Sequence, residues 1–234
     1  HFICMRRLLY TAFLALVLTS FSACFTMTEE VTLRSNGSGS FARTVDMSQL
    51  LGMMSMFMPD SLKDSLDFSK MDFNEMTARF VGLNGISNVK SDYDKSGIIT
   101  LSFDFKNLTA LNSAITKGTQ KDDITKELGL DATMDDKYIS KGRCIGRTAS
   151  MKSDKTTSEL MDMFKSDEYK DVMNMFSPPT MRIVYHLPSP AKKIKTKEKG
   201  VQVIKDGNDV TLEYNMLDMF MGKNKKVYNH SIKY

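Results

Sequence analysis

Alternation of apolar and polar residues is the clearest pattern in this chain, and it predicts strands with one buried face. The segment 30–46 alternates on both sides of Asn36–Gly37–Ser38–Gly39, which is typical of a hairpin turn. The segments 86–93 and 98–105 alternate on both sides of a second turn at Asp94–Gly97. Further strands are expected at 138–147, 181–185, 201–204, 210–214 and 227–234.

Other segments repeat apolar residues every three or four positions, which is the spacing of a helix with one buried stripe. We expect helices at 72–83, at 107–117 with Asn107 as the N-cap, and at 156–176. A further helix at 48–58 is apolar on almost all sides, so we expect it to be buried or covered.

These patterns together predict an α+β fold, in which an antiparallel β-sheet built from hairpins has helices packed on one face. No linker rich in glycine, proline or serine divides residues 30–234, so a single domain is expected there. The last strand-like run, 227–234, leaves open whether the natural C-terminus lies further on.

The N-terminal pattern is different, because an apolar run at 8–18 follows two arginines and leads to small residues before Cys24. This order is typical of a secretory signal, and the ending Phe21–Ser22–Ala23–Cys24 resembles a bacterial lipobox. The apolar run is too short for a transmembrane helix, which needs about 20 residues. We therefore expect a signal peptide at 5–23, acyl chains such as palmitate on Cys24, and a short tether at 24–29.

This N-terminal segment predicts a place in the cell envelope, at the periplasmic face of the outer membrane or at the cell surface. The lipid on Cys24 would anchor the protein to the membrane, and no other cofactor is expected. Residues 1–4 precede Met5, the expected initiator, and are interpreted as upstream read-through outside the fold.

The predicted helix at 48–58 is rich in methionine, a flexible and polarizable residue that adapts to irregular apolar surroundings. Such a cluster can fill a protein core, or it can line a surface that accepts varied apolar partners. The candidate lining of an apolar ligand site is Met53, Met54, Met56, Phe57 and Met58.

Charge gives no indication of a nucleic-acid partner. The chain has 32 basic and 28 acidic side chains, and removal of the two signal arginines leaves 30 and 28. The basic run at 192–199 has no interleaved aromatic residues on which bases could stack. We interpret it as a solvated loop, with contact to an anionic lipid or another polyanion as the alternative.

The sequence contains no recognisable catalytic or metal-binding motif, so we expect a protein that is not an enzyme. Cys144 is the one cysteine left in the expected mature chain, which excludes an internal disulfide, and we expect it to be a small buried residue. His186 and His230 lie far apart in sequence, without neighbours at metal-ligand spacing. The acidic pairs 122–123 and 135–136 are expected to be solvated loop charges.

Six features of the chain are considered together. They are the lipobox, the hairpin turn at 35–41, Asp46–Met47–Ser48 with its methionine run, the strand 101–105 followed by Asn107–Leu108, the strand 181–188, and the Asp206–Gly207 turn. Together they resemble uncharacterised envelope lipoproteins of the Bacteroidota and, more loosely, the LppM-like lipoprotein domain. The resemblance implies an envelope lipoprotein of α+β fold, and the LppM-like comparison alone implies a lipid or glycolipid ligand. The segment 50–66 departs from the LppM-like pattern.

The same bacterial group can glycosylate Asp-Ser-Leu triplets in the periplasm. Asp60–Ser61–Leu62 and Asp64–Ser65–Leu66 match that triplet. Residues that start a helix are an equally good interpretation of both triplets.

Two classes of function stay open at this level. The first is a non-catalytic module that binds a lipid or another apolar envelope molecule beside the methionine cluster. The second is a structural or assembly lipoprotein that contacts other envelope proteins through a sheet edge or an exposed apolar patch.

Overall fold

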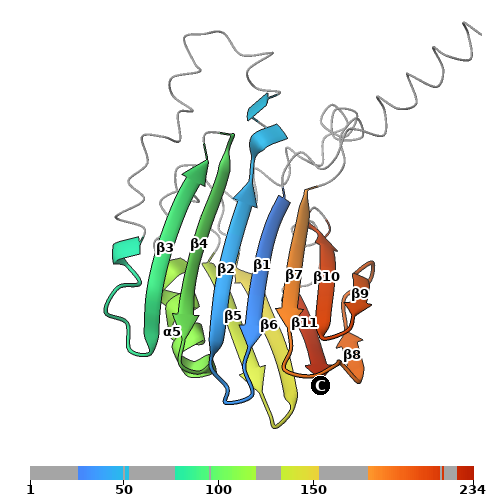
Figure 1. The fold of residues 1–234 in the computed structure, drawn as a ribbon. Coiled ribbons are helices and arrows are strands. Elements are labelled where there is room, and N and C mark those ends of the chain that lie inside the picture. The colour runs from blue at the N-terminus through green and yellow to red at the C-terminus, as the bar shows by residue number, and fades with distance from the viewer. Residues whose placement is uncertain are drawn as a thin grey trace, which may run out of the picture.

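The structure is a computed structural model, and it describes residues 26–49, 51–52, 77–94, 96–119, 133–152, 179–216, 218 and 226–234. These residues form two facing β-sheets, with helix α5 (Leu108–Thr119) beside the smaller sheet (Figure 1). Within the described part of the chain, no helix is both long and apolar enough to cross a membrane.

The larger sheet has seven strands in the order β3-β4-β2-β1-β7-β10-β9. Three hairpins supply six of these strands, as the alternation predicts, and β1 lies parallel to β7 while the other pairs are antiparallel. The bounds are β1 Thr26–Leu33, β2 Gly39–Asp46, β3 Ile86–Asp94, β4 Ile98–Phe105, β7 Thr180–His186, β9 Gln202–Asp206 and β10 Asp209–Asn215.

The smaller sheet has four antiparallel strands in the order β5-β6-β11-β8. It faces one side of the larger sheet, and α5 lies next to β5, covering the part of the same side that belongs to β3 and β4 (Figure 1). The bounds are β5 Thr133–Ser140, β6 Cys144–Lys152, β8 Lys193–Thr196 and β11 Lys226–Lys233.

The core lies between these two layers, because alternate residues of each strand point into it. The aromatic rings of Phe41 and Phe103 stack with their centroids 5.1 Å apart, and Phe80 stacks on Phe103 at 5.5 Å. Burial of this apolar surface, at about 25 cal/mol per Å², is the main force that holds the layers together. Other buried members are Val31, Phe105, Leu111, Ala114, Ile115, Ile145, Ile183, Leu212 and Ile232.

The predicted α+β arrangement, an antiparallel sheet covered by helices, is wrong for the described residues. The larger sheet is mixed, and a second sheet with one helix beside it covers its inner face. Two polar segments that read as loops cause the difference, since 133–136 lies in β5 and the lysine run at 192–199 contains β8. Strand formation depends on pairing with neighbouring strands, so a polar segment can complete a sheet edge.

The helix predicted at 107–117 is confirmed as α5, and the side chain of Asn107 caps it by accepting a hydrogen bond from the Ala110 N–H at 2.9 Å. In the segment predicted as a helix at 72–83, the described part is helical only at Thr77 and Ala78, and turns follow. Gly82, within these turns, has a φ of 80°, which is incompatible with a continuing helix.

Most of the other predicted helical residues lie outside the described part of the chain, including all of 156–176 and 53–58. Strand β1 begins at Thr26 rather than at the predicted residue 30, so most of the predicted tether belongs to the sheet. Cys144 begins β6 and is half-buried rather than fully buried.

Candidate functional site

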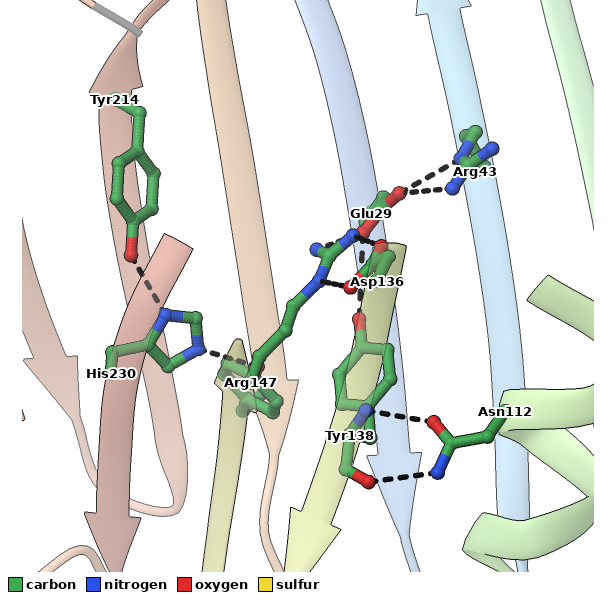
Figure 2. Close-up of polar contacts among 9 residues, drawn as sticks. Glu29, Arg43, Asn112, Asp136, Tyr138, Arg147, Tyr214 and His230 are labelled. Carbon is green, nitrogen blue, oxygen red and sulfur yellow. Dashed lines mark hydrogen bonds and ion pairs between the residues drawn. The ribbon is translucent and has the colours of Figure 1, made fainter. Parts of the chain in front are cut away.

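A group of charged side chains lies in the core between the two sheets (Figure 2). Arg147 comes from β6, Glu29 from β1 and Asp136 from β5, and their exposed fractions are 0%, 1% and 4%. Each occupies an inward position of its strand, so the alternation that buries the neighbouring apolar residues also buries these charges. A buried charge requires a partner, and these three residues supply partners to one another.

Arg147 bridges the two sheets through both carboxylates. Its Nε donates to Oδ1 of Asp136 at 2.8 Å, and its two terminal nitrogens contact Asp136 and Glu29. On the other side of Glu29, Nε of Arg43 donates to Oε1 at 2.8 Å. Two guanidinium groups therefore face two carboxylates, and the group of four residues, here called the ionic cluster, is neutral overall.

The electrostatics of the ionic cluster follow from its burial. Burial alone would raise the pKa of Glu29, but Arg147 and Arg43 outweigh it and lower that pKa to about 2. Burial likewise opposes the charge on Arg147, but the neighbouring anions raise its pKa well above the ordinary value. Glu29 and Arg147 are therefore both charged near neutral pH.

A second buried polar group lies in the same interface and is here called the histidine cluster. His230 of β11 has Nε2 at 2.7 Å from the Tyr185 hydroxyl and Nδ1 at 2.8 Å from the Tyr214 hydroxyl. Burial and the nearby Arg147 lower the pKa of His230 to about 3. The neutral ring has one N–H donor and one acceptor nitrogen, so one tyrosine accepts a hydrogen bond and the other donates one.

Tyr138 connects the ionic cluster to helix α5. Its hydroxyl donates to Glu29 at 3.4 Å, and the guanidinium carbon of Arg147 lies 5.0 Å from the centre of its ring. The backbone of Tyr138 pairs with the side-chain amide of Asn112, which donates to the carbonyl at 2.8 Å and accepts from the N–H at 2.7 Å. Asn112 thus bonds the free edge of β5 as a neighbouring strand would.

Both clusters lie in the interior, and the ionic cluster is also bonded to Tyr138 outside it. Their charged and polar groups bond one another in the interior, where they fix how the sheets and α5 pack. Across the described residues, no group of three or more His, Cys, Asp or Glu side chains is arranged to hold a metal ion. The geometry of both clusters supports a structural role.

The sheet edges provide the other candidate site, because an edge strand presents unpaired backbone groups to a partner. Three of the four edges in the described structure are blunted. Strand β3 has a bulge between Ser87 and Lys90, with Asn88 at a φ of 54°. Strand β5 is bonded by Asn112, and β8 has four residues with exposed lysines.

Strand β9 is the exception among these edges. It pairs with β10 in unbroken register, and all five of its residues are exposed. Two of them are large and apolar, Val203 with 44% and Ile204 with 52% of its surface exposed. Gly207, with a φ of 55°, occupies the first position of the two-residue turn to β10, as a type II′ hairpin requires.

The site residues predicted from the sequence lie outside the described part of the chain. They are Cys24 and the candidate apolar lining Met53, Met54, Met56, Phe57 and Met58.

The residues of the ionic cluster were not predicted as a site. Asp136 was interpreted as a solvated loop charge, and Glu29 was assigned to the tether, yet both are buried. One signal was present, because Arg147 lies at the inward position between Ile145 and Ala149 on the same strand. A charge in the middle of an apolar stripe indicates a buried partner of opposite sign.

Comparison with known proteins identifies no family. No family model matches the chain, and the search of curated proteins found no match either. Among solved structures, the NMR structure of the folded domain of LppM from Mycobacterium tuberculosis is similar, with a TM-score of 0.38 and 11% identity over 92% of each chain. This is a weak structural likeness.

Proposed function

We propose that this chain is a non-catalytic, lipid-anchored envelope protein that assembles with another envelope protein through strand β9. One observation carries the proposal, which is the regular, fully exposed edge with Val203 and Ile204 on it. Among the described strands, the β3 edge has a bulge, the β5 edge is bonded by a side chain, and β8 is a four-residue strand with two lysines, whereas β9 is regular, unbonded at its outer edge and carries one lysine, Lys205.

The proposed anchor follows from the lipobox and from the start of the fold. Strand β1 begins two residues after Cys24, so acyl chains on that cysteine would hold the sheets close to the membrane surface. Stable anchoring requires more than one chain, because each buried methylene contributes about 0.8 kcal/mol. Substitution Cys24→Ser is expected to leave a protein without acyl chains that fractionates away from membranes. Continued membrane association through an acylated N-terminus would contradict the anchor.

An edge contact is favoured over catalysis because the buried polar side chains between the sheets are already hydrogen-bonded to protein groups. The ionic cluster and the histidine cluster bond within themselves, between the sheets. A lipid or apolar ligand beside Met53–Met58 stays a prediction, since those residues lie outside the described part. The β9 edge is the surface for which the geometry itself supports a partner.

Photo-crosslinking in intact cells tests this function. A benzophenone amino acid replaces Ile204 on β9 in one variant and the exposed Lys90 on the opposite edge strand β3 in its control. We expect a discrete protein adduct from position 204 that is absent from position 90. Adducts that are equal at the two positions, or a lipid adduct alone at position 204, would contradict the assembly role.

A further inference from the structure

The partner chemistry can be inferred from β9 and its surroundings. We propose that β9 binds an extended, acidic segment of another protein, which adds to the larger sheet as an eighth strand beside β9. This inference rests on the proposed assembly function and names the kind of partner that the same edge fits. It combines three observations, which concern the backbone, the side chains and the charge.

The backbone of β9 directs hydrogen-bonding groups away from β10 at two positions. Asp206 and Asp209 close a two-residue hairpin, so they form a hydrogen-bonded pair, and pairs alternate from there along the ladder. Ile204 is therefore bonded to β10, whereas Val203 and Lys205 direct their N–H and C=O groups to the free edge. An added strand would bond to these groups.

The side chains of β9 offer apolar contacts on both faces of the sheet. Val203 pairs with Leu212, which points into the core, and Ile204 pairs with Thr211 on the outer face. Paired residues share a face, so an added strand would cover one exposed apolar side chain on each side. Its apolar residues would need to lie at neighbouring positions, one for each face.

The charge around β9 is positive. From residue 192 to the end of β9 at 206, six exposed lysines stand against two acidic residues, Glu198 and Asp206. In the described part of the chain, none of the six forms an ion pair. They are Lys192, Lys193, Lys195, Lys197, Lys199 and Lys205.

These lysines select among possible partners. Lysine on an edge strand opposes pairing with a second copy of itself or with a basic segment, because like charges would lie side by side. A segment with aspartate or glutamate relieves that repulsion, and the exclusion of other segments gives specificity. An anionic membrane would also attract lysines, but it would make no use of the backbone groups of Val203 and Lys205.

The test uses the full-length lipidated protein in phosphatidylcholine nanodiscs and two synthetic nine-residue peptides. One peptide combines glutamate with adjacent pairs of valine, and the other has lysine in place of each glutamate. We expect the acidic peptide to bind and the basic peptide not to bind, with an affinity that falls as salt increases. Exchange of Lys197, Lys199 and Lys205 for glutamine is expected to weaken binding about tenfold, since three exposed pairs are lost.

A matched pair of variants isolates the strand pairing. Val203→Pro removes an N–H that points to the free edge and spares the bonds to β10, so it is expected to abolish binding. Val203→Thr keeps the N–H and the branched side chain and is expected to bind. Lys90→Gln, on the opposite edge strand, removes one charge and is expected to leave binding unchanged.

The remaining outcomes separate the two proposals. Equal binding of both peptides, or of neither, while the crosslink at position 204 persists, would overturn the acidic partner and leave the assembly function standing. Binding of phosphatidylglycerol vesicles that depends on the lysines but is unaffected by Val203→Pro would overturn the strand pairing in favour of a membrane contact. Loss of the protein crosslink would overturn the proposed function itself.

Discussion

Arg147 is the residue on which the packing of the two sheets depends most directly. It is fully buried and neutralises two carboxylates that come from different sheets. The net contribution of such a cluster to the free energy of unfolding can be small, because burial of each charge is costly. Loss of one member is a different matter, since it leaves the remaining charges buried without a partner.

Substitution Arg147→Met is therefore expected to lower the free energy of unfolding by roughly 3–5 kcal/mol. The control is Arg182→Met, which breaks the exposed Arg182–Glu213 pair and is expected to cost less than about 1 kcal/mol. Urea unfolding measures both values. Equal losses in the two variants would show that the ionic cluster is not bonded as described.

The burial of His230 predicts that the protein loses stability as the pH falls. Its pKa is about 3 in the folded protein against 6.5 in an exposed histidine, so the unfolded chain binds a proton first as the pH falls. Its contribution to stability is complete above pH 6.5 and is lost progressively between pH 6.5 and 3. Between pH 7 and 5 the loss is expected to be about 2 kcal/mol.

The variant His230→Gln keeps a donor and an acceptor between the two tyrosines but does not titrate. It is expected to be less stable than the natural chain at pH 7 and to lose less stability between pH 7 and 5. Urea unfolding at the two pH values checks this. An unchanged pH dependence in the variant would contradict a neutral, buried His230.

At the scale of elements, α5 has two tasks, since it covers part of the core and closes the edge of β5. Leu111, Ala114 and Ile115 face the core, while Asn112 bonds the backbone of Tyr138. The periodicity of the sequence predicts the helix and its cap. It does not predict that Asn112 bonds the edge of β5, because a single asparagine on a helix does not indicate which strand lies beside it.

Substitution Asn112→Leu is expected to leave the N–H and C=O of Tyr138 without their side-chain partner. The cost is expected to be about 1–3 kcal/mol, together with a greater tendency to self-associate through the opened edge of β5. The control is Ser113→Leu at the exposed neighbouring position of α5. Unfolding and light scattering measure the two effects, and similar behaviour of both variants would contradict the role of Asn112.

The sequence predicts elements well where the pattern is strong. The hairpins of β1–β2, β3–β4 and β9–β10 have alternation and turn glycines, and all three are present. The sequence does not predict β8 or the first half of β5, because their polar residues alternate with too few apolar ones. Their pairing with β6 and β11 holds them in place, and this long-range contact leaves no local signal. The single strand predicted at 138–147 is wrong, since it spans the end of β5, a bend and the start of β6.

At the scale of the whole molecule, the proposed anchor precedes β1, and the open edge lies at β9. The predicted fold class is wrong because the four-stranded sheet forms through contacts between strands that are distant in sequence. Local patterns predict single strands, but not how they pair. The sequence predicts that a sheet edge could contact a partner, but it does not predict which edge. Which of four edges stays open depends on the bulge in β3, the bond from Asn112 and the length of β8.

The most direct test of the β9 interface is residue-resolved hydrogen exchange, in native envelopes and in the purified full-length protein. In the purified protein the amide of Ile204, bonded to β10, is expected to exchange slowly, and the outward amides of Val203 and Lys205 rapidly. We expect these two outward amides to become protected in native envelopes. Equally rapid exchange of Val203 and Lys205 in both preparations would contradict an occupied edge.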